Sequence, residues 1–192
     1  MNLTALIFLG LLIICSIVLY SVYASVIKRK NKVKEAFSGI NVQLKKRYDL
    51  IPNILTIANQ FMEHERGLME ELTKLRTEVL SVPDSYENIE KKLDLDNQIK
   101  NKMQQLLVSV ENYPQLKSDQ TMLAAMQTYN EVEEHIAAAR RFFNSAVNDL
   151  NNAVEIFPSS LFAKKLGITT QEFFEVSNAE TKPINAGEYF KK

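Results

Sequence analysis

The most distinct pattern in the chain is an apolar N-terminal segment followed at once by a basic cluster. No charged residue occurs from Leu3 to Ile27, and the cluster consists of Lys28, Arg29, Lys30, Lys32 and Lys34. A helix of this length can cross a hydrocarbon core of about 30 Å, and basic residues mark the cytoplasmic side of such a helix. The pattern predicts a single-pass protein of the cell membrane that contacts membrane lipids through residues 3–27. Its short N-terminus would lie outside and its C-terminal domain in the cytoplasm.

A cleaved signal peptide is the alternative interpretation of this segment, because Val22-Tyr23-Ala24 offers a small residue for cleavage. The apolar stretch is longer than a usual signal core, however, and the positive charges lie on its far side. A lipoprotein signal is disfavoured because Ile14 precedes Cys15, where a small residue is needed. Cys15 is the only cysteine, so the chain cannot form an internal disulfide.

Beyond the anchor, apolar residues recur in alternating steps of four and three, which is typical of a packed helix. Only Arg47 and Glu65 interrupt this first series, and Pro52 predicts a kink or a brief break between two packed helices. The apolar members are Val33, Phe37, Ile40, Leu44, Ile51, Ile54, Ala58, Phe61, Leu68, Leu72, Leu75 and Val79.

Two further long helices are predicted between proline-containing turns. The first of them follows Val82-Pro83-Asp84-Ser85 and ends near Asn112-Tyr113-Pro114. The next opens near Ser118 or Asp119 and runs to Phe157, and its apolar series is interrupted only by Glu133 and Arg140. A short helix is expected around residues 160–166, and Thr169 and Glu172 have the spacing of a capping box before Phe173.

These elements predict an all-α protein: an N-terminal transmembrane helix followed by an antiparallel up-and-down helical bundle. The bundle would contain three long helices and a shorter C-terminal helix. We expect residues 1–29 to form the anchor and its basic flank, residues 30–180 the bundle domain, and residues 181–192 a loosely ordered tail.

The four charged residues within the apolar series are the candidate polar layer or partner site. They are Arg47, Glu65, Glu133 and Arg140. A charge at such a position is costly unless it meets a partner or water. The favoured interpretation is that these residues fix helix register through ion pairs. The alternative is a polar pocket for a ligand or for the charged group of a partner.

Charge and motif content argue against several function classes. The 23 Lys and Arg residues balance the 23 Asp and Glu residues, so the basic surplus of a nucleic-acid binder is absent from the composition. A di-metal site in a helical bundle needs a Glu three residues before a His. In this chain the residue three positions before His64 is Phe61, and the residue three positions before His135 is Val132. Glu131 and His135 could share one ion, but their spacing is common on surface helices. We therefore expect no cofactor, no bound metal and no catalysis.

Two segments resemble the LemA family. One is Gln43-Leu44-Lys45-Lys46-Arg47-Tyr48-Asp49-Leu50-Ile51-Pro52-Asn53-Ile54, and the other is Ile136-Ala137-Ala138-Ala139-Arg140-Arg141-Phe142-Phe143-Asn144. Phe37 and Leu150 depart from the Trp and Tyr that are frequent in relatives, but both remain apolar. The resemblance implies a prokaryotic membrane protein with a cytoplasmic bundle and no agreed biochemical activity. It adds Asp49, Asn53, His64, Arg141 and Asn144 to the candidate polar positions.

Together these features predict a membrane-anchored scaffold or interaction module that binds a protein partner or a second copy of itself. The alternative is a sensor that binds a small molecule or a metal in the polar layer. A closed, ion-paired layer would favour the scaffold, whereas an enclosed cavity reached by Arg47, Glu65 or Arg140 would favour the sensor.

Overall fold

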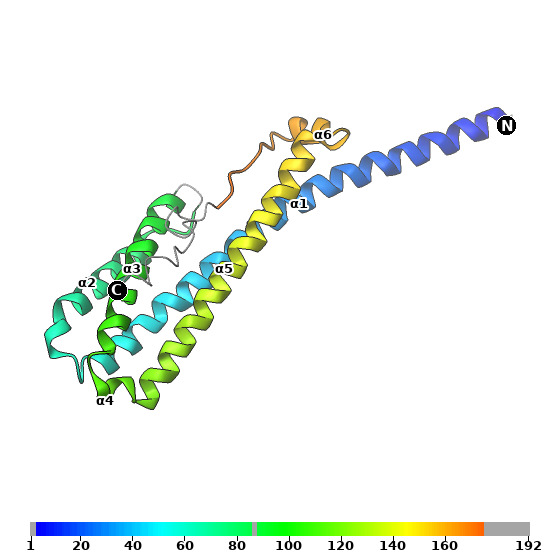
Figure 1. Cartoon of the computed structure of the whole chain (residues 1–192). Helices are drawn as coiled ribbons and strands as arrows, with labels where there is room; N and C mark the ends of the chain where they lie inside the picture. Colours follow the sequence, from blue (N-terminus) through cyan, green and yellow to red (C-terminus); the bar gives the residue numbers. More distant parts are fainter. Residues whose placement is uncertain (1–2, 86–87, 175–192) are drawn as a thin grey trace, which may run out of the picture. The chain divides into compact units, whose positions relative to one another are not determined.

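The computed structural model describes residues 3–85 and 88–174, so the predicted tail at 181–192 lies outside the described residues. The described residues are helical and contain no strand, and the all-α prediction is confirmed (Figure 1). The elements are α1 (Leu3–Ala58), the 3₁₀ helix η1 (Glu63–Glu65), α2 (Arg66–Ser81), α3 (Ile89–Val110), α4 (Pro114–Lys117), α5 (Gln120–Glu155) and α6 (Ser159–Lys165).

The chain divides into two compact units, which are described separately. Among the described residues, the anchor unit comprises 3–36 and 140–174, and the bundle unit comprises 37–85 and 88–139. Both α1 and α5 contribute residues to each unit.

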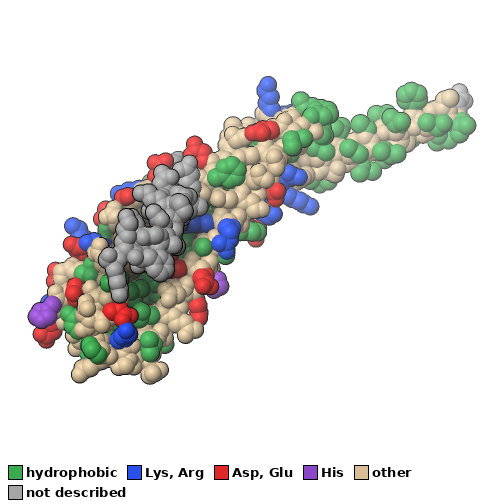
Figure 2. All heavy atoms as spheres, viewed as in Figure 1, with side chains coloured by type: hydrophobic (Ala, Val, Ile, Leu, Met, Phe, Trp, Pro, Cys, Tyr) green, Lys and Arg blue, Asp and Glu red, His purple; other side chains and the backbone are tan. Residues whose placement is uncertain are grey.

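The N-terminal part of α1 exposes its hydrophobic side chains in the anchor unit. Phe8 is 73% exposed and Tyr20 is 71% exposed, whereas the side chain of Val26 is fully buried. Hydrophobic side chains cover this part of α1 in Figure 2. The helix is long and apolar enough to cross a membrane, with a mean hydropathy of 2.6 over its most apolar stretch.

The core of the bundle unit consists of the apolar positions that recur in steps of four and three. In α1 these include Ile40, Leu44, Ile51 and Ile54, all fully buried. Leu72 of α2 is also fully buried, and α3 packs beside α2 and buries Ile99, Met103 and Leu106. The heptad pattern therefore identifies the residues that hold these helices together.

The helix α1 continues through Pro52, so the break that was one of the two expectations at this residue does not occur. Proline has no N–H, so the carbonyl of Tyr48 one turn earlier loses its usual helical donor. Nε of Arg76, on α2, donates to this carbonyl at 2.7 Å. Arg76 thus satisfies the acceptor that Pro52 leaves unpaired, and the helix continues to Ala58.

The break between the first two bundle helices lies later, at residues 59–62, where the chain turns into η1. The buried side chain of Met62 fixes this turn. Because the helix ends at Ala58, the heptad phase of α1 does not extend to Glu65. The first two bundle helices are therefore separated at residues 59–62 and not at Pro52, and Glu65 lies in η1.

The capping box predicted at Thr169 and Glu172 does not start a helix, because residues 168–174 follow α6 without helical structure. Two asparagine side chains of α5 bind this segment instead. The amide of Asn144 accepts from the backbone N of Phe174 at 2.8 Å and donates to its carbonyl at 3.0 Å. Asn151 makes the same pair of bonds with Gln171, both at 2.9 Å. Side-chain amides thus replace the helical hydrogen bonds of the segment.

Candidate functional site

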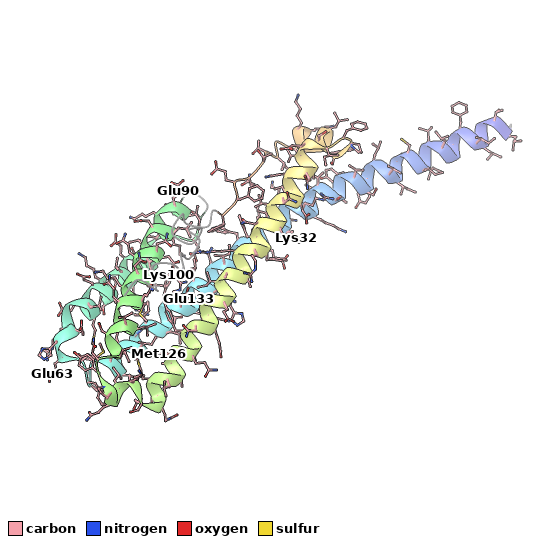
Figure 3. All side chains as sticks on the ribbon, in the orientation of Figure 1. Lys32, Glu63, Glu90, Lys100, Met126 and Glu133 are labelled. Atoms are coloured by element: carbon pink, nitrogen blue, oxygen red, sulfur yellow. The ribbon has the colours of Figure 1, made fainter. Side chains whose placement is uncertain are left out.

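A buried charged cluster in the bundle unit is the strongest candidate site. Arg47 of α1 is 1% exposed, and its Nη1 lies 2.7 Å from Oδ1 of Asp96 on α3. Its Nη2 lies 2.6 Å from Oε1 of Glu133 on α5. Figure 3 shows Glu133 on the side of α5 that faces α1 and α3. One guanidinium therefore joins three helices, as its planar set of donors allows.

Two tyrosines complete the cluster. The Tyr48 hydroxyl donates to Oδ1 of Asp96 at 3.0 Å, so this carboxylate binds both Arg47 and Tyr48. Tyr129, one turn before Glu133 on α5, is buried beside the same charges. Its hydroxyl is close enough to Glu133 to interact with it, although the two groups are not aligned in a regular hydrogen bond.

The charges of the cluster stabilise one another. Burial alone would lower the pKa of Arg47, but the attraction of Asp96 and Glu133 outweighs it and raises the pKa above the ordinary value. Asp96 is as deeply buried as Arg47, whereas the side chain of Glu133 is 25% exposed. The two carboxylates exceed the single guanidinium by one charge, and water can solvate part of that excess at Glu133.

Burial raises the pKa of the Tyr129 hydroxyl above its ordinary value of 10.0, and Arg47 opposes the shift only in part. A raised folded-state pKa means that the folded state holds this proton more tightly than the unfolded state does. The stabilisation is complete below pH 10 and is lost as the pH rises toward the folded-state pKa.

We expect the Tyr129→Phe variant to lose less stability than the wild type between neutral and strongly alkaline pH, because it has no buried phenol to ionise. Urea denaturation at a series of pH values would measure this difference. The Tyr113→Phe variant, at a half-exposed position in the turn before α4, is the matched control. If the free energy of unfolding fell equally with rising pH in the Tyr129→Phe variant and in the wild type, the prediction would be contradicted.

The structure joins two of the four predicted polar-layer residues directly, Arg47 and Glu133. Glu65 lies in η1, half-exposed, beyond the end of α1. Arg140 is half-buried and falls in the anchor unit, so it is described apart from the cluster.

The sequence analysis missed Asp96, the third charged member of the cluster, and the two tyrosines beside it. For Asp96 the signal was present, because the four-three series of α3 passes through it. Lys92, Asp96, Ile99, Met103, Leu106 and Val110 are all buried. The nearby residues Leu93 and Leu95 are apolar but lie outside this series, so the sequence pattern alone did not reveal that Asp96 takes a core position.

Most of the polar positions suggested by the family resemblance lie on the surface. Asn53, His64 and Arg141 are exposed. Asp49 is 56% exposed and makes a long ion pair of 3.8 Å with Arg76. Asn144 is the exception, because it binds the backbone of Phe174.

In the basic cluster that follows the apolar segment, two residues contact Asp149 of α5 and three are exposed. Nη1 of Arg29 donates to the carbonyl of Asp149 at 2.8 Å, and Nζ of Lys32 lies 3.4 Å from the carboxylate of the same residue. Lys28, Lys30 and Lys34 are exposed.

The described residues form a surface groove that lies apart from the charged cluster. A groove between α1 and α2 is lined by Leu55, Asn59, Met69 and Thr73 among others, away from Arg47. Among the residues that the structure describes, no group of three or more His, Cys, Asp and Glu side chains is arranged to hold a metal ion.

Comparison with known proteins shows which proteins the chain is similar to. The sequence model of the LemA family matches residues 36–186. Two proteins of Paramagnetospirillum magneticum, the magnetosome proteins MamQ 1 and MamQ 2, are each 28% identical to the chain over 100 residues. This match covers 52% of the chain but only 37% of the length of each relative.

Proposed function

This chain belongs to the LemA family, and we propose that it is a single-pass membrane protein whose helical bundle is a non-catalytic scaffold or interaction module. The N-terminus would lie outside the cell membrane and the bundle in the cytoplasm. Two relatives, MamQ 1 and MamQ 2, are magnetosome proteins, and a scaffold role for this chain agrees with their names.

The observation that carries this proposal is the continuity of α1. The helix that exposes an uncharged apolar surface from residue 3 continues without interruption into the bundle core and ends at Ala58. Exposed apolar surface of this size is unfavourable in water and favourable in lipid. The basic residues that follow it support a cytoplasmic position for the bundle.

The geometry of the charged cluster favours a scaffold over a sensor. A ligand approaching from solvent would have to displace Asp96 or Glu133 to reach Arg47, which is 1% exposed. Buried ion pairs that join helices are best known for fixing register. Partner contacts would then lie on the outer helix faces, where Asp49 and Asn53 occur one turn apart on α1.

Crosslinking of the full-length protein in its native membrane would test this proposal. We expect discrete crosslinked products, either with a second protein or with another copy of the chain. The Arg47→Leu/Asp96→Leu/Glu133→Leu variant should keep these products, because it changes two buried side chains and one that is only 25% exposed. The Asp49→Ala/Asn53→Ala variant, matched to it as a surface change, should weaken them.

The opposite pattern would contradict the scaffold proposal. If the interior variant remained folded by circular dichroism but lost its crosslinked products, the polar layer would itself be the binding site. The sensor interpretation would then be preferred.

A further inference from the structure

The corner between α5 and α6 lies beside the apolar segment of α1. In the anchor unit the rings of Tyr23 and Phe162 meet edge to face, with centroids 6.4 Å apart. Tyr23 belongs to the uncharged stretch that ends at Ile27, whereas Phe162 is the fourth residue of α6. The helix α6 thus lies beside α1 near the C-terminal end of its apolar segment, just before the basic residues begin (Figure 1).

The contacts along α1 and α5 locate this corner relative to the basic flank. Arg29 and Lys32 both bind Asp149, and Tyr23 meets Phe162, so the two helices run antiparallel here. The end of α5 at Glu155 lies about 9 Å beyond Asp149, at 1.5 Å per residue. The α5–α6 corner is therefore level with the last turns of the apolar segment.

The corner exposes large apolar side chains that the fold does not use. Ile156 is 58% exposed, Phe157 is 74% exposed and Leu161 is 61% exposed. Lys164 and Lys165 follow them at the end of α6 and are also exposed. Figure 2 shows hydrophobic side chains gathered at this corner next to α1. Apolar residues beside lysines are typical of a surface that lies in the headgroup region of a bilayer.

We propose that the α5–α6 corner is a second membrane-contact site, which inserts Ile156, Phe157 and Leu161 at the boundary between headgroups and acyl chains. Lys164 and Lys165 bind anionic lipid headgroups there. This inference rests on the proposed function, because it requires α1 to be inserted. We choose lipid as the partner of this surface for two reasons. The corner lies at the same level as the end of the apolar segment of α1, and exposed lysines lie at its edge.

Tryptophan fluorescence would test the site, because the chain contains no tryptophan. The full-length F157W variant would be reconstituted into phosphatidylcholine and phosphatidylglycerol vesicles, with some lipids brominated on the acyl chains near the headgroup. The F142W variant is the matched control, because Phe142 is 48% exposed and lies about 20 Å before the end of α5. The L12W variant reports insertion of the anchor itself.

We expect brominated lipids to quench F157W strongly and F142W weakly, with emission of F157W at the shorter wavelength. Similar weak quenching of F157W and F142W, with L12W quenched, would overturn the second contact while leaving the anchor intact. Blue-shifted emission of F157W without quenching would indicate contact with protein and would also overturn it. An unquenched L12W would refute the proposed anchor and this inference together.

The lysines would be tested by lipid charge. Removing phosphatidylglycerol from the vesicles should weaken the quenching of F157W. When K164Q and K165Q are introduced into the F157W variant, its quenching should no longer depend on phosphatidylglycerol. Adding K45Q and K46Q, an adjacent exposed pair in the bundle unit, should leave the dependence on phosphatidylglycerol unchanged. Equal effects of the two pairs would contradict specific headgroup binding at the corner.

Discussion

Replacing Arg47 with leucine is expected to lower the free energy of unfolding by about 3–5 kcal/mol, the usual cost of removing one partner of a buried ion pair. Asp96 would keep its buried position and the hydrogen bond from Tyr48, but it would lose the guanidinium that lies 2.7 Å from its Oδ1. Glu133 can turn toward water, so most of the cost falls on Asp96. Urea denaturation in detergent, followed by far-ultraviolet circular dichroism, would measure the change.

The Arg66→Leu variant is the matched control, because Arg66 is exposed at the start of α2. A surface change of this kind should shift stability by no more than about 0.5 kcal/mol. The Arg47→Leu/Asp96→Leu/Glu133→Leu variant should recover most of the loss, since apolar residues of similar volume can replace a buried ion pair. An Arg47→Leu variant as stable as the control would mean that the cluster does not interlock the helices.

Removal of residues 1–27 is expected to transfer the protein from the membrane fraction to the soluble fraction. This change deletes the exposed apolar part of α1, whose insertion would otherwise be effectively irreversible. The α5–α6 corner would retain weak, salt-sensitive attraction to anionic lipids, so the fractions are compared after a high-salt wash. Truncated protein that stayed with washed membranes would contradict the single-anchor proposal.

The orientation of the protein in the membrane would be tested by labelling cysteine reporters. In a Cys15→Ala background, Thr4→Cys should react with a membrane-impermeant maleimide on intact cells. Glu134→Cys, exposed on α5, should react only after permeabilisation. The reverse labelling pattern would place the bundle outside the cytoplasm.

The heptad pattern predicted the fold well because burial and helical period are local properties of the sequence. It located the core positions of α1 and α5 and the inward positions of Arg47 and Glu133. It could not show that Arg76 would satisfy the carbonyl exposed by Pro52, because that contact joins separate helices. The continuity of α1 through Pro52 is therefore a tertiary effect.

The same limit explains the errors in the position of the first break and at the end of α6. A periodic pattern can persist across a turn, so spacing alone did not reveal that α1 ends at Ala58. The capping-box spacing of Thr169 and Glu172 was local evidence for a helix. The amides of Asn144 and Asn151 outweigh it by binding the segment in a non-helical conformation.

The Arg47 cluster also has a consequence for how the protein is made. Its three charged members are far apart in the chain, and Glu133 leaves the ribosome long after Arg47. At a synthesis rate of about 5–20 residues per second, the interval between them is roughly 4–17 s. During that time Arg47 has no complete set of partners. This arginine therefore stays hydrated until α5 emerges and closes the cluster.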